Sequence, residues 1–291
     1  MRYQVTGFVG LGQMGKYISK HIVAAGYNLI AYDTAGTEDR APQGARIAHN
    51  VEEMAEAEVV FLSLPDGDAS KEVCSKISGV SNKRTQVVVD LSTIGITAAQ
   101  ECAELLQRAG IAYVDSPVSG GQKGAIEGNL TLMIAAEEKT LNDVRPLLAT
   151  FGENIFHIGQ TPGQGQCMKL INNFLAGAIM YSTCEAVMTG VKFGLDMKQM
   201  IDVINVSTGS SFMSRVMFPE CVIKGTYHSG FAMALLMKDL KLYHESIKGH
   251  LGIPHELSDK ILELYSDCYR EYGNEDSSYL FKYLLDKSKV Y

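Results

Sequence analysis

The chain has 291 residues, which exceeds the usual size of one domain, so we expect two domains or one large domain with a substantial addition. Its composition is 46% hydrophobic and 20% charged, which is typical of globular proteins and excludes a disordered chain. The net charge is −7 and no Lys/Arg run exceeds two residues. These features argue against a nucleic-acid-binding groove and against a patch for anionic membranes.

The cellular setting is predicted from what the chain lacks. The longest charge-free stretches, 154–168 and 170–184, have 15 residues each and contain polar amides, so we expect no transmembrane helix, which needs about 20 apolar residues. The start of the chain has no basic segment followed by an apolar one, so we expect no secretory signal. The six cysteines are never closer than 17 residues, so no metal-type or redox-type pair exists. We expect a cytoplasmic protein with reduced thiols and no metal.

In the first half of the chain, short apolar runs alternate with helical patterns. The expected strands are residues 5–9, 28–32, 59–64, 86–91, 112–118, 130–136 and 154–158, and helices between them include 16–25 and 98–108. This alternation predicts a parallel sheet covered by helices on both faces. The continuous apolar runs predict central strands buried on both sides. The closely spaced strands after Gly121 suggest an antiparallel extension.

After about residue 160 the pattern becomes helical nearly to the end. A Thr-Pro-Gly breaker at 161–163 precedes residues 164–193, which predict one helix of roughly 30 residues, about 45 Å long. This helix is expected to join the domains, which we place at 1–162 and 163–291. The sequence thus predicts an α/β domain with a doubly wound sheet, followed by an all-α domain.

A glycine-rich loop follows the first expected strand and opens a helix. It reads Gly10-Leu11-Gly12-Gln13-Met14-Gly15. In a dinucleotide-binding loop, Gly10 permits the tight turn, Gly12 lets the backbone approach a pyrophosphate, and Gly15 packs the helix against the strand. The helix N-terminus then presents free N–H groups to the phosphates. The alternative is a glycine turn without a ligand, but the strand–loop–helix context favours dinucleotide binding.

Asp33 indicates which dinucleotide is bound. It ends the second expected strand, 18 residues past Gly15, close to the usual spacing for an acid that holds the adenosine ribose hydroxyls. A carboxylate there accepts hydrogen bonds from the 2′-hydroxyl and repels a 2′-phosphate, so NAD is favoured over NADP. Arg40 is the nearest base in the following loop and lies too far along the chain to reverse this prediction.

A second glycine loop, residues 115–124, follows a strand at the edge where open α/β sheets bind ligands. Gly120 and Gly121 expose backbone N–H groups that can bind a carboxylate, and Ser119 adds a hydroxyl. A hairpin-like glycine loop without a ligand is the alternative interpretation.

Lys169 and Asn173 are spaced i, i+4 on the long expected helix, so both project from one face. Apolar neighbours at positions 168, 170, 171, 174 and 175 predict that this part of the helix is largely buried. A lysine in an apolar cleft loses solvation, which lowers its pKa toward the range useful for acid–base catalysis. Asn173 can hold the reacting oxygen or the lysine head group. The alternative is a lysine whose stem packs on the helix while its amine reaches water.

Four sequence blocks occur in the order of a known family. They are Gly7 to Gly15, Asp115 to Gly121, Gly163 to Asn173 and Lys238 to Leu242. Through these blocks, which span nearly the whole chain, it resembles the β-hydroxyacid dehydrogenase family. That family includes 3-hydroxyisobutyrate dehydrogenase, tartronate semialdehyde reductase and 2-(hydroxymethyl)glutarate dehydrogenase. The resemblance implies a Rossmann-type first domain and a homodimer or homotetramer.

The resemblance also implies roles for individual residues. Lys169 would be the catalytic acid/base, Asn173 would contact substrate, and Ser119, Gly120 and Gly121 would hold the substrate carboxylate. The cofactor would be lined by Leu64, Pro65, Thr93 and Lys238, with Asp239 orienting Lys238. Two positions depart from the family pattern: Ala69 stands where some relatives have a cofactor-contacting asparagine, and Lys241 replaces a residue that is often small or neutral.

The function predicted from these residues is hydride transfer between NAD and a short 3-hydroxy acid, or the matching semialdehyde. An imine reductase on the same scaffold is an alternative, but relatives of that kind generally lack the lysine at the position of Lys169. A non-catalytic NAD-binding module is another alternative. It would need only the first domain, so the presence of Lys169, Asn173 and Ser119 counts against it.

Overall fold

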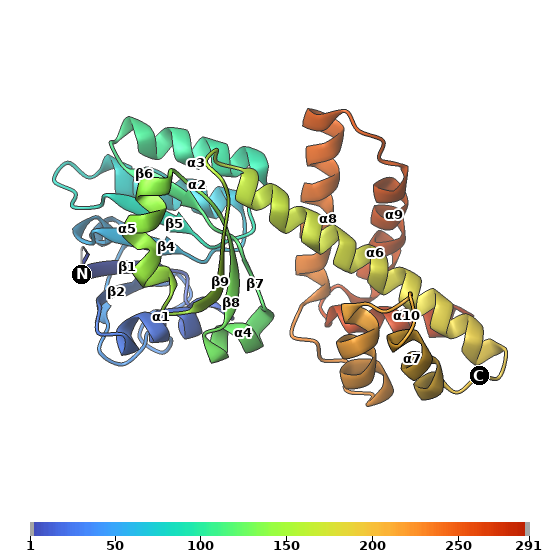
Figure 1. Cartoon of the computed structure of the whole chain (residues 1–291). Helices are drawn as coiled ribbons and strands as arrows, with labels where there is room; N and C mark the ends of the chain where they lie inside the picture. The colour runs from blue at the N-terminus through green and yellow to red at the C-terminus, as the bar shows by residue number, and fades with distance from the viewer. Residues whose placement is uncertain (1–2, 289–291) are drawn as a thin grey trace. The chain divides into compact units, whose positions relative to one another are not determined.

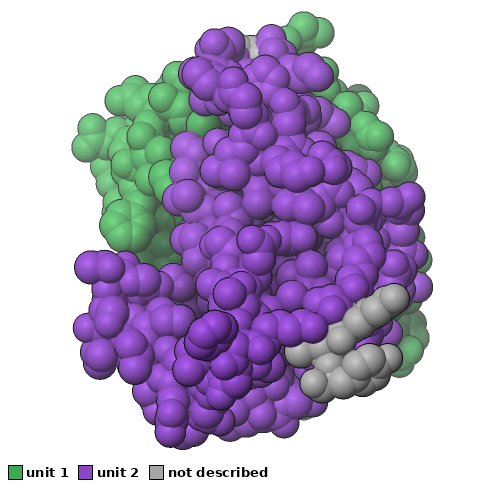
Figure 2. Space-filling view, turned by 90° about the vertical axis from the view of Figure 1, so that its right-hand side faces the viewer, with its two compact units in different colours: residues 1–169 green, residues 170–291 purple. Residues whose placement is uncertain are grey.

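The computed structural model describes residues 3–288, apart from the side chain at position 250. It divides into two compact units, residues 1–169 and 170–291, which Figure 2 colours green and purple. The division falls inside one long helix, α6 (Gln164–Lys192), and so lies later than the boundary expected after residue 162.

Unit 1 is built on one mixed sheet (Figure 1). Its strands are β1 (Val5–Val9), β2 (Asn28–Tyr32), β3 (Arg46–Ile47), β4 (Val59–Leu62), β5 (Val87–Asp90), β6 (Ala112–Asp115), β7 (Val118–Ser119), β8 (Leu130–Ala135) and β9 (Gly152–Gly159). The order is β3-β2-β1-β4-β5-β6-β8-β7, with β9 beside β8. Strands β1 to β6 pair in parallel, whereas β8 runs antiparallel to β6 and β7. The expected parallel sheet and its antiparallel extension are both confirmed.

Helices cover both faces of this sheet because its central strands are apolar on both sides. The α-helices of unit 1 that precede α6 are α1 (Gly15–Ala24), α2 (Gly67–Gly79), α3 (Ile96–Arg108), α4 (Gly121–Glu127) and α5 (Glu138–Leu148). Phe61 of β4 joins the core formed with α1 and α5, while its neighbours Val60 and Leu62 join the core formed with α2 and α3. Adjacent strand residues point to opposite faces, so one apolar run supplies both cores.

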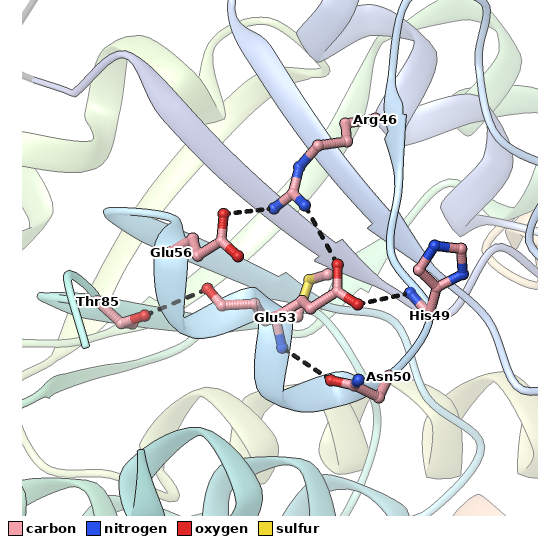
Figure 3. Close-up of polar contacts among 7 residues, drawn as sticks. Arg46, His49, Asn50, Glu53, Glu56 and Thr85 are labelled. Carbon is pink, nitrogen blue, oxygen red and sulfur yellow. Dashed lines mark hydrogen bonds and ion pairs between the residues drawn. The ribbon is translucent and has the colours of Figure 1, made fainter. Parts of the chain in front are cut away.

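A short 3₁₀ helix, η1 (Val51–Glu56), packs against α2, β1 and β2 and is fixed by polar contacts (Figure 3). The Asn50 side chain caps it by accepting from the Glu53 N–H at 3.1 Å. Arg46 of β3 donates to Glu53 at 3.2 Å and to Glu56 at 2.8 Å. The Thr85 hydroxyl donates to the Met54 carbonyl within η1 at 3.4 Å and to the Ala57 carbonyl just after η1 at 2.9 Å. Such a short element has too few residues to show a hydrophobic period, so the sequence pattern does not predict it.

Unit 2 is helical, as expected (Figure 1). Besides the greater part of α6 it contains α7 (Met197–Asn205), η2 (Met213–Ile223), α8 (Met233–Ser246), η3 (Ile247–Leu251), α9 (Glu256–Tyr272), η4 (Ser277–Tyr279) and α10 (Leu280–Ser288). Tyr265 lies fully buried in its core and donates its hydroxyl hydrogen to the Gly177 carbonyl at 2.9 Å. That bond satisfies the polar end of an otherwise apolar side chain and ties α9 to α6.

Within residues 3–288, α6 is the one helix that is long and apolar enough to cross a membrane by length and composition alone. This criterion does not test the expectation that the chain has no transmembrane helix, which stays a prediction. The core helix of a soluble protein meets the same criterion, so length and composition do not decide where α6 lies.

Candidate active site

The glycine loop after β1 has the close backbone packing that its sequence predicts. Gly10 has a φ of +92°, and a Cβ there would lie 2.2 Å from the Ser63 carbonyl oxygen. A Cβ on Gly15, where α1 begins, would lie 1.9 Å from the Gly10 carbonyl oxygen. By contrast, apart from Gly12 and its two chain neighbours, no atom of the described chain lies within 4 Å of the Cβ position at Gly12. The backbone at Gly12 is thus open to a ligand, which fits the approach of a pyrophosphate. Of the intervening residues, Leu11 is buried, Met14 is half-buried and Gln13 is exposed.

Asp33 follows β2 and joins that strand end to the glycine loop. Its carboxylate accepts from the Leu11 N–H at 2.6 Å and from the Ala35 N–H at 2.7 Å. Arg40, although distant along the chain, lies with its guanidinium 3.6 Å from the same carboxylate. The loop folds back because the Thr37 hydroxyl accepts the Asp33 N–H at 2.8 Å. The inference that chain distance keeps Arg40 away from this position is therefore wrong.

The expected cofactor-lining residues after β4 and β5 are connected through Ser92. The Leu64 N–H donates to the Ser92 hydroxyl at 2.8 Å, and the Ser92 N–H donates to Asp90 at 2.9 Å. Leu64 and Thr93 are half-buried, and Pro65 is exposed. Both loops leave the carboxyl ends of parallel strands, where open α/β sheets bind ligands.

The second glycine loop joins β7 to α4. Ser119 pairs with Thr131 of β8, and Gly120 and Gly121 have φ values of +127° and +60°. Apart from Gly121 itself, its chain neighbours and the backbone of its own helix, no atom of residues 3–288 lies within 4 Å of the Cβ position at Gly121, so this position faces open space. Gln122 donates to Gln13 of the first glycine loop at 2.8 Å. The fold of unit 1 thus brings the two predicted ligand loops next to each other.

The first turn of α6 is fixed by Asp115, which ends β6 and is fully buried. One carboxylate oxygen accepts the Gly163 N–H at 2.9 Å and the Gln166 N–H at 3.2 Å, and the other accepts the Gln166 side-chain amide at 2.8 Å. Burial raises the pKa of Asp115 to about 6, although these hydrogen bonds favour its ionised form. Burial also raises the pKa of nearby Asp90.

Lys169 and Asn173 lie one turn apart on α6, as the i, i+4 spacing predicts. Lys169 is half-buried, while Leu170 and Asn173 are buried. However, Ile171 and Leu175 are exposed. The expectation that this part of the helix is largely buried is therefore wrong for one helix face. Apolar side chains lie all around the helix here, and the rest of the protein chain covers only some of them.

In unit 2, Asn173 is held by Asp239 of α8. The Asn173 amide donates to Asp239 at 2.6 Å and its oxygen accepts from Asn172 at 3.0 Å. The Lys238 amine lies 3.3 Å from the same aspartate, which agrees with the orienting role that the resemblance implies for Asp239. Lys238 also lines a pocket of about 310 Å³ with Lys241 and Tyr269.

The sequence alone did not predict that Asp115 and Gln166 together fix the first turn of α6. The signal was present, because an aspartate that closes an apolar strand is buried with it and needs partners. What the sequence did not supply was the partner, since Gln166 lies far along the chain from Asp115.

Two families match this chain by their sequence profiles. The one described as the NAD binding domain of 6-phosphogluconate dehydrogenase matches residues 5–159. The other, described as NAD-binding of NADP-dependent 3-hydroxyisobutyrate dehydrogenase, matches residues 163–284.

Characterised relatives match over most of the chain. 2-(Hydroxymethyl)glutarate dehydrogenase of Eubacterium barkeri is 36% identical over 254 residues, which cover 85% of this chain and 84% of the relative. The mitochondrial 3-hydroxyisobutyrate dehydrogenase of Rattus norvegicus is 32% identical and covers 97% of this chain and 87% of its own.

Among solved structures, Mycobacterium tuberculosis 3-hydroxyisobutyrate dehydrogenase with L-serine superposes with a TM-score of 0.88 at 28% identity, covering 97% of this chain and 99% of its own. The Streptomyces aurantiacus imine reductase superposes less well, with a TM-score of 0.63 at 20% identity and coverage of 97% and 99%, and shares the fold alone. The chain therefore belongs to the β-hydroxyacid dehydrogenase family and is an NAD-binding oxidoreductase.

Proposed function

We propose that this protein oxidises a short 3-hydroxy acid, or reduces the matching semialdehyde, with NAD as the second substrate. The observation that carries the proposal is half-buried Lys169 one helical turn before buried Asn173. A primary amine beside a fixed amide is suited to moving the proton of a substrate hydroxyl, because side chains four residues apart share one helix face and would be able to contact the same oxygen.

In the oxidation direction, the neutral Lys169 amine removes the hydroxyl proton, and in reduction its ammonium returns a proton to the same oxygen. The Asn173 amide has two N–H bonds, of which one donates to Asp239. Its other N–H would hold the substrate oxygen. Bound NAD would exchange the hydride with the carbinol carbon.

The substrate carboxylate would be anchored by Ser119, Gly120 and Gly121. The positive φ at both glycines and the open space at Gly121 support this assignment, because an anion needs unobstructed access to backbone N–H groups. Anchoring the carboxylate fixes the position of the carbinol carbon, and such orientation lowers the barrier to hydride transfer.

The substrate class is narrowed by the names of the relatives. 3-Hydroxyisobutyrate, 2-(hydroxymethyl)glutarate and L-serine each carry a hydroxymethyl group on the carbon next to a carboxylate. We propose that the substrate of this protein is a primary alcohol of this kind, and that the protein acts in the cytoplasm. The remaining substituent on that carbon, whether methyl, hydroxymethyl or carboxyalkyl, would be distinguished by a substrate panel followed through NADH absorbance.

Lys169→Ala tests the assignment directly. It should lower kcat by roughly 10²–10⁴, the usual contribution of a general acid–base group. NADH affinity, measured by fluorescence titration, should change little, because the phosphate contacts come from residues 10–15. Retention of more than a tenth of the wild-type kcat would show that the lysine amine is only solvated at the surface. No turnover of any hydroxy acid by the wild type would favour a non-catalytic NAD-binding module.

A further inference from the structure

Gln166 uses its whole side-chain amide inside unit 1. The oxygen accepts from the Ile94 N–H at 2.9 Å and the Gly95 N–H at 3.2 Å. The nitrogen donates to the Ser92 carbonyl at 3.0 Å and to Asp115 at 2.8 Å. An amide has two donor hydrogens and two acceptor lone pairs, so all four are occupied. The side chain is fully buried, which makes each of these bonds costly to lose.

The backbone around Gln166 is fixed at the same place. Its own N–H and that of Gly163 both donate to Asp115. A Cβ on Gly165 would lie 2.6 Å from the Met133 carbonyl oxygen and 2.9 Å from that of Asp115. The first turn of α6 is thus packed directly on the backbone of β6 and β8. A shift of this turn would break several bonds at once.

The same hydrogen bonds continue to the predicted cofactor loops. Ser92, whose carbonyl binds Gln166, receives the Leu64 N–H on its hydroxyl at 2.8 Å. Its own N–H donates to Asp90 at 2.9 Å. Side chains at the ends of β5 and β6 therefore connect the loop at Leu64, the loop at Thr93 and the start of α6.

We propose that Gln166 and Asp115 are positioning residues that hold Lys169 in register with the loops that contact the dinucleotide. The proposal rests on the function proposed above for Lys169. Lys169 lies one turn after Gln166, so a tilt of the first turn would displace its amine. Misplacement of a reacting group by 1 Å can cost about 100-fold in rate. A role confined to the stability of unit 1 is the competing explanation.

Gln166→Met separates these explanations, because it keeps the length of the side chain and removes all four hydrogen bonds. We expect kcat to fall at least tenfold, with a smaller change in the KM of the hydroxy acid, and the dissociation constant of NADH to rise at least threefold. The matched control is Thr85→Val. Thr85 is also buried and bonded to backbone carbonyls (Figure 3). However, it precedes β5 and so lies at the end of that strand opposite to Ser92.

The control should lower the melting temperature while leaving kcat and NADH affinity within twofold of the wild type. If Gln166→Met behaves in the same way, Gln166 only stabilises the fold and the proposal is wrong. The NADH titration does not depend on Lys169 being the acid/base. Suppose that Gln166→Met changes NADH affinity while Lys169→Ala retains the wild-type kcat. That result would contradict the proposed function without contradicting the link between Gln166 and the cofactor loops.

A reversed pair tests the contact between the two positioning residues. Gln166→Glu places a carboxylate oxygen against the Asp115 carboxylate, and Asp115→Asn places an N–H group against the Gln166 N–H. Each single variant should lose activity. The double variant Asp115→Asn/Gln166→Glu again places a hydrogen-bond donor opposite an acceptor. Its kcat should be at least tenfold higher than that of the less active single variant.

Recovery should be partial, because the Ser92 carbonyl would still face a carboxylate oxygen. If the losses of the two single variants simply multiply in the double variant, the contact does not position Lys169. Should Gln166→Met fail to fold, this comparison of three variants decides the proposal alone.

Discussion

At the scale of single residues, the ion pair between Asp33 and Arg40 bears on the choice of dinucleotide. The carboxylate should repel a 2′-phosphate, while the guanidinium 3.6 Å away offers that phosphate a partner. Two backbone N–H groups hold the carboxylate in place, whereas the arginine side chain is exposed. The fixed Asp33 carboxylate should therefore affect the choice of cofactor more than the exposed Arg40 guanidinium does.

We therefore predict that NAD is preferred over NADP at least tenfold in kcat/KM, which corresponds to about 1.4 kcal/mol in transition-state binding. Asp33→Ser should narrow or reverse this preference, because Arg40 then acts without its counter-charge. Arg40→Gln should widen it. Steady-state kinetics with both cofactors checks each variant, and equal efficiencies in the wild type would contradict the assignment of Asp33.

The carboxyl group of Asp115 gives a pH-dependent stability. Its pKa is raised by burial from 3.8 to about 6 in the folded protein, so between these values the folded state retains a proton that the unfolded state has lost. The stabilising contribution is complete below pH 4 and is lost as the pH rises through 6. The loss amounts to about 3 kcal/mol for a shift of this size. Asp90 faces the same region and contributes with the same sign, because burial raises its pKa too.

Urea unfolding at pH 4, 5, 6 and 7 measures this effect. From pH 4 to pH 7, the free energy of unfolding of the wild type should decrease by about 2–3 kcal/mol relative to that of Asp115→Asn. Comparing the change with pH, rather than absolute stability, removes the effect of the altered hydrogen bonds in the variant. Parallel pH profiles would show that the folded carboxyl titrates normally.

At the scale of elements, a helix or strand could be predicted from the sequence when its hydrophobic pattern was long. The apolar runs of β4 and β5 and the helical stretch of α6 were recognisable because burial on both faces, or over many turns, leaves a long signal. The two-residue strand β3 and the helix η1 left none. Of the candidate site, spacing along the sequence predicts the glycine loops, Asp33 and the Lys169–Asn173 pair. The partners of Asp115 and Asn173 were not found, because they come from distant segments that only folding brings together.

The loop before α4 allows a test of the carboxylate anchor. Gly121→Val adds a side chain in the space where the anion is proposed to lie, and it does so at a φ of +60°, which valine rarely adopts. We predict a loss of kcat/KM of at least 100-fold with NADH affinity nearly unchanged. Gly110→Val is the matched control, since Gly110 also has a positive φ and open space at its Cβ position but lies between α3 and β6.

The control should lose stability and retain kcat/KM. In the wild type, an alcohol that lacks the acid group should be a poor substrate, because its binding leaves the anchoring N–H groups unpaired. Equal efficiency with the neutral alcohol would contradict the anchor while leaving the dehydrogenase assignment intact.

At the scale of the whole molecule, the surface of α6 points to assembly. Ile171, Leu175 and Ile179 are 38%, 50% and 37% exposed, and their spacing of four residues puts them on one helix face. A row of exposed aliphatic side chains on successive turns is typical of a protein–protein contact. Since the family resemblance implies a homodimer or homotetramer, we predict that this face is buried between copies of the chain.

Light scattering coupled to size exclusion should therefore give a mass of two or four times the 31.7 kDa of one chain at micromolar concentration. Ile179→Asp introduces a charge into the proposed contact, and burying it unpaired is costly, so the mass should fall toward that of one chain on dilution. Glu185→Gln, at an exposed polar position of the same helix, should leave the mass unchanged. If the wild-type protein stays monomeric at high concentration, the prediction that this α6 face is buried between copies is wrong. In that case Ile179→Asp should change neither mass nor stability appreciably, because an exposed position tolerates a charge.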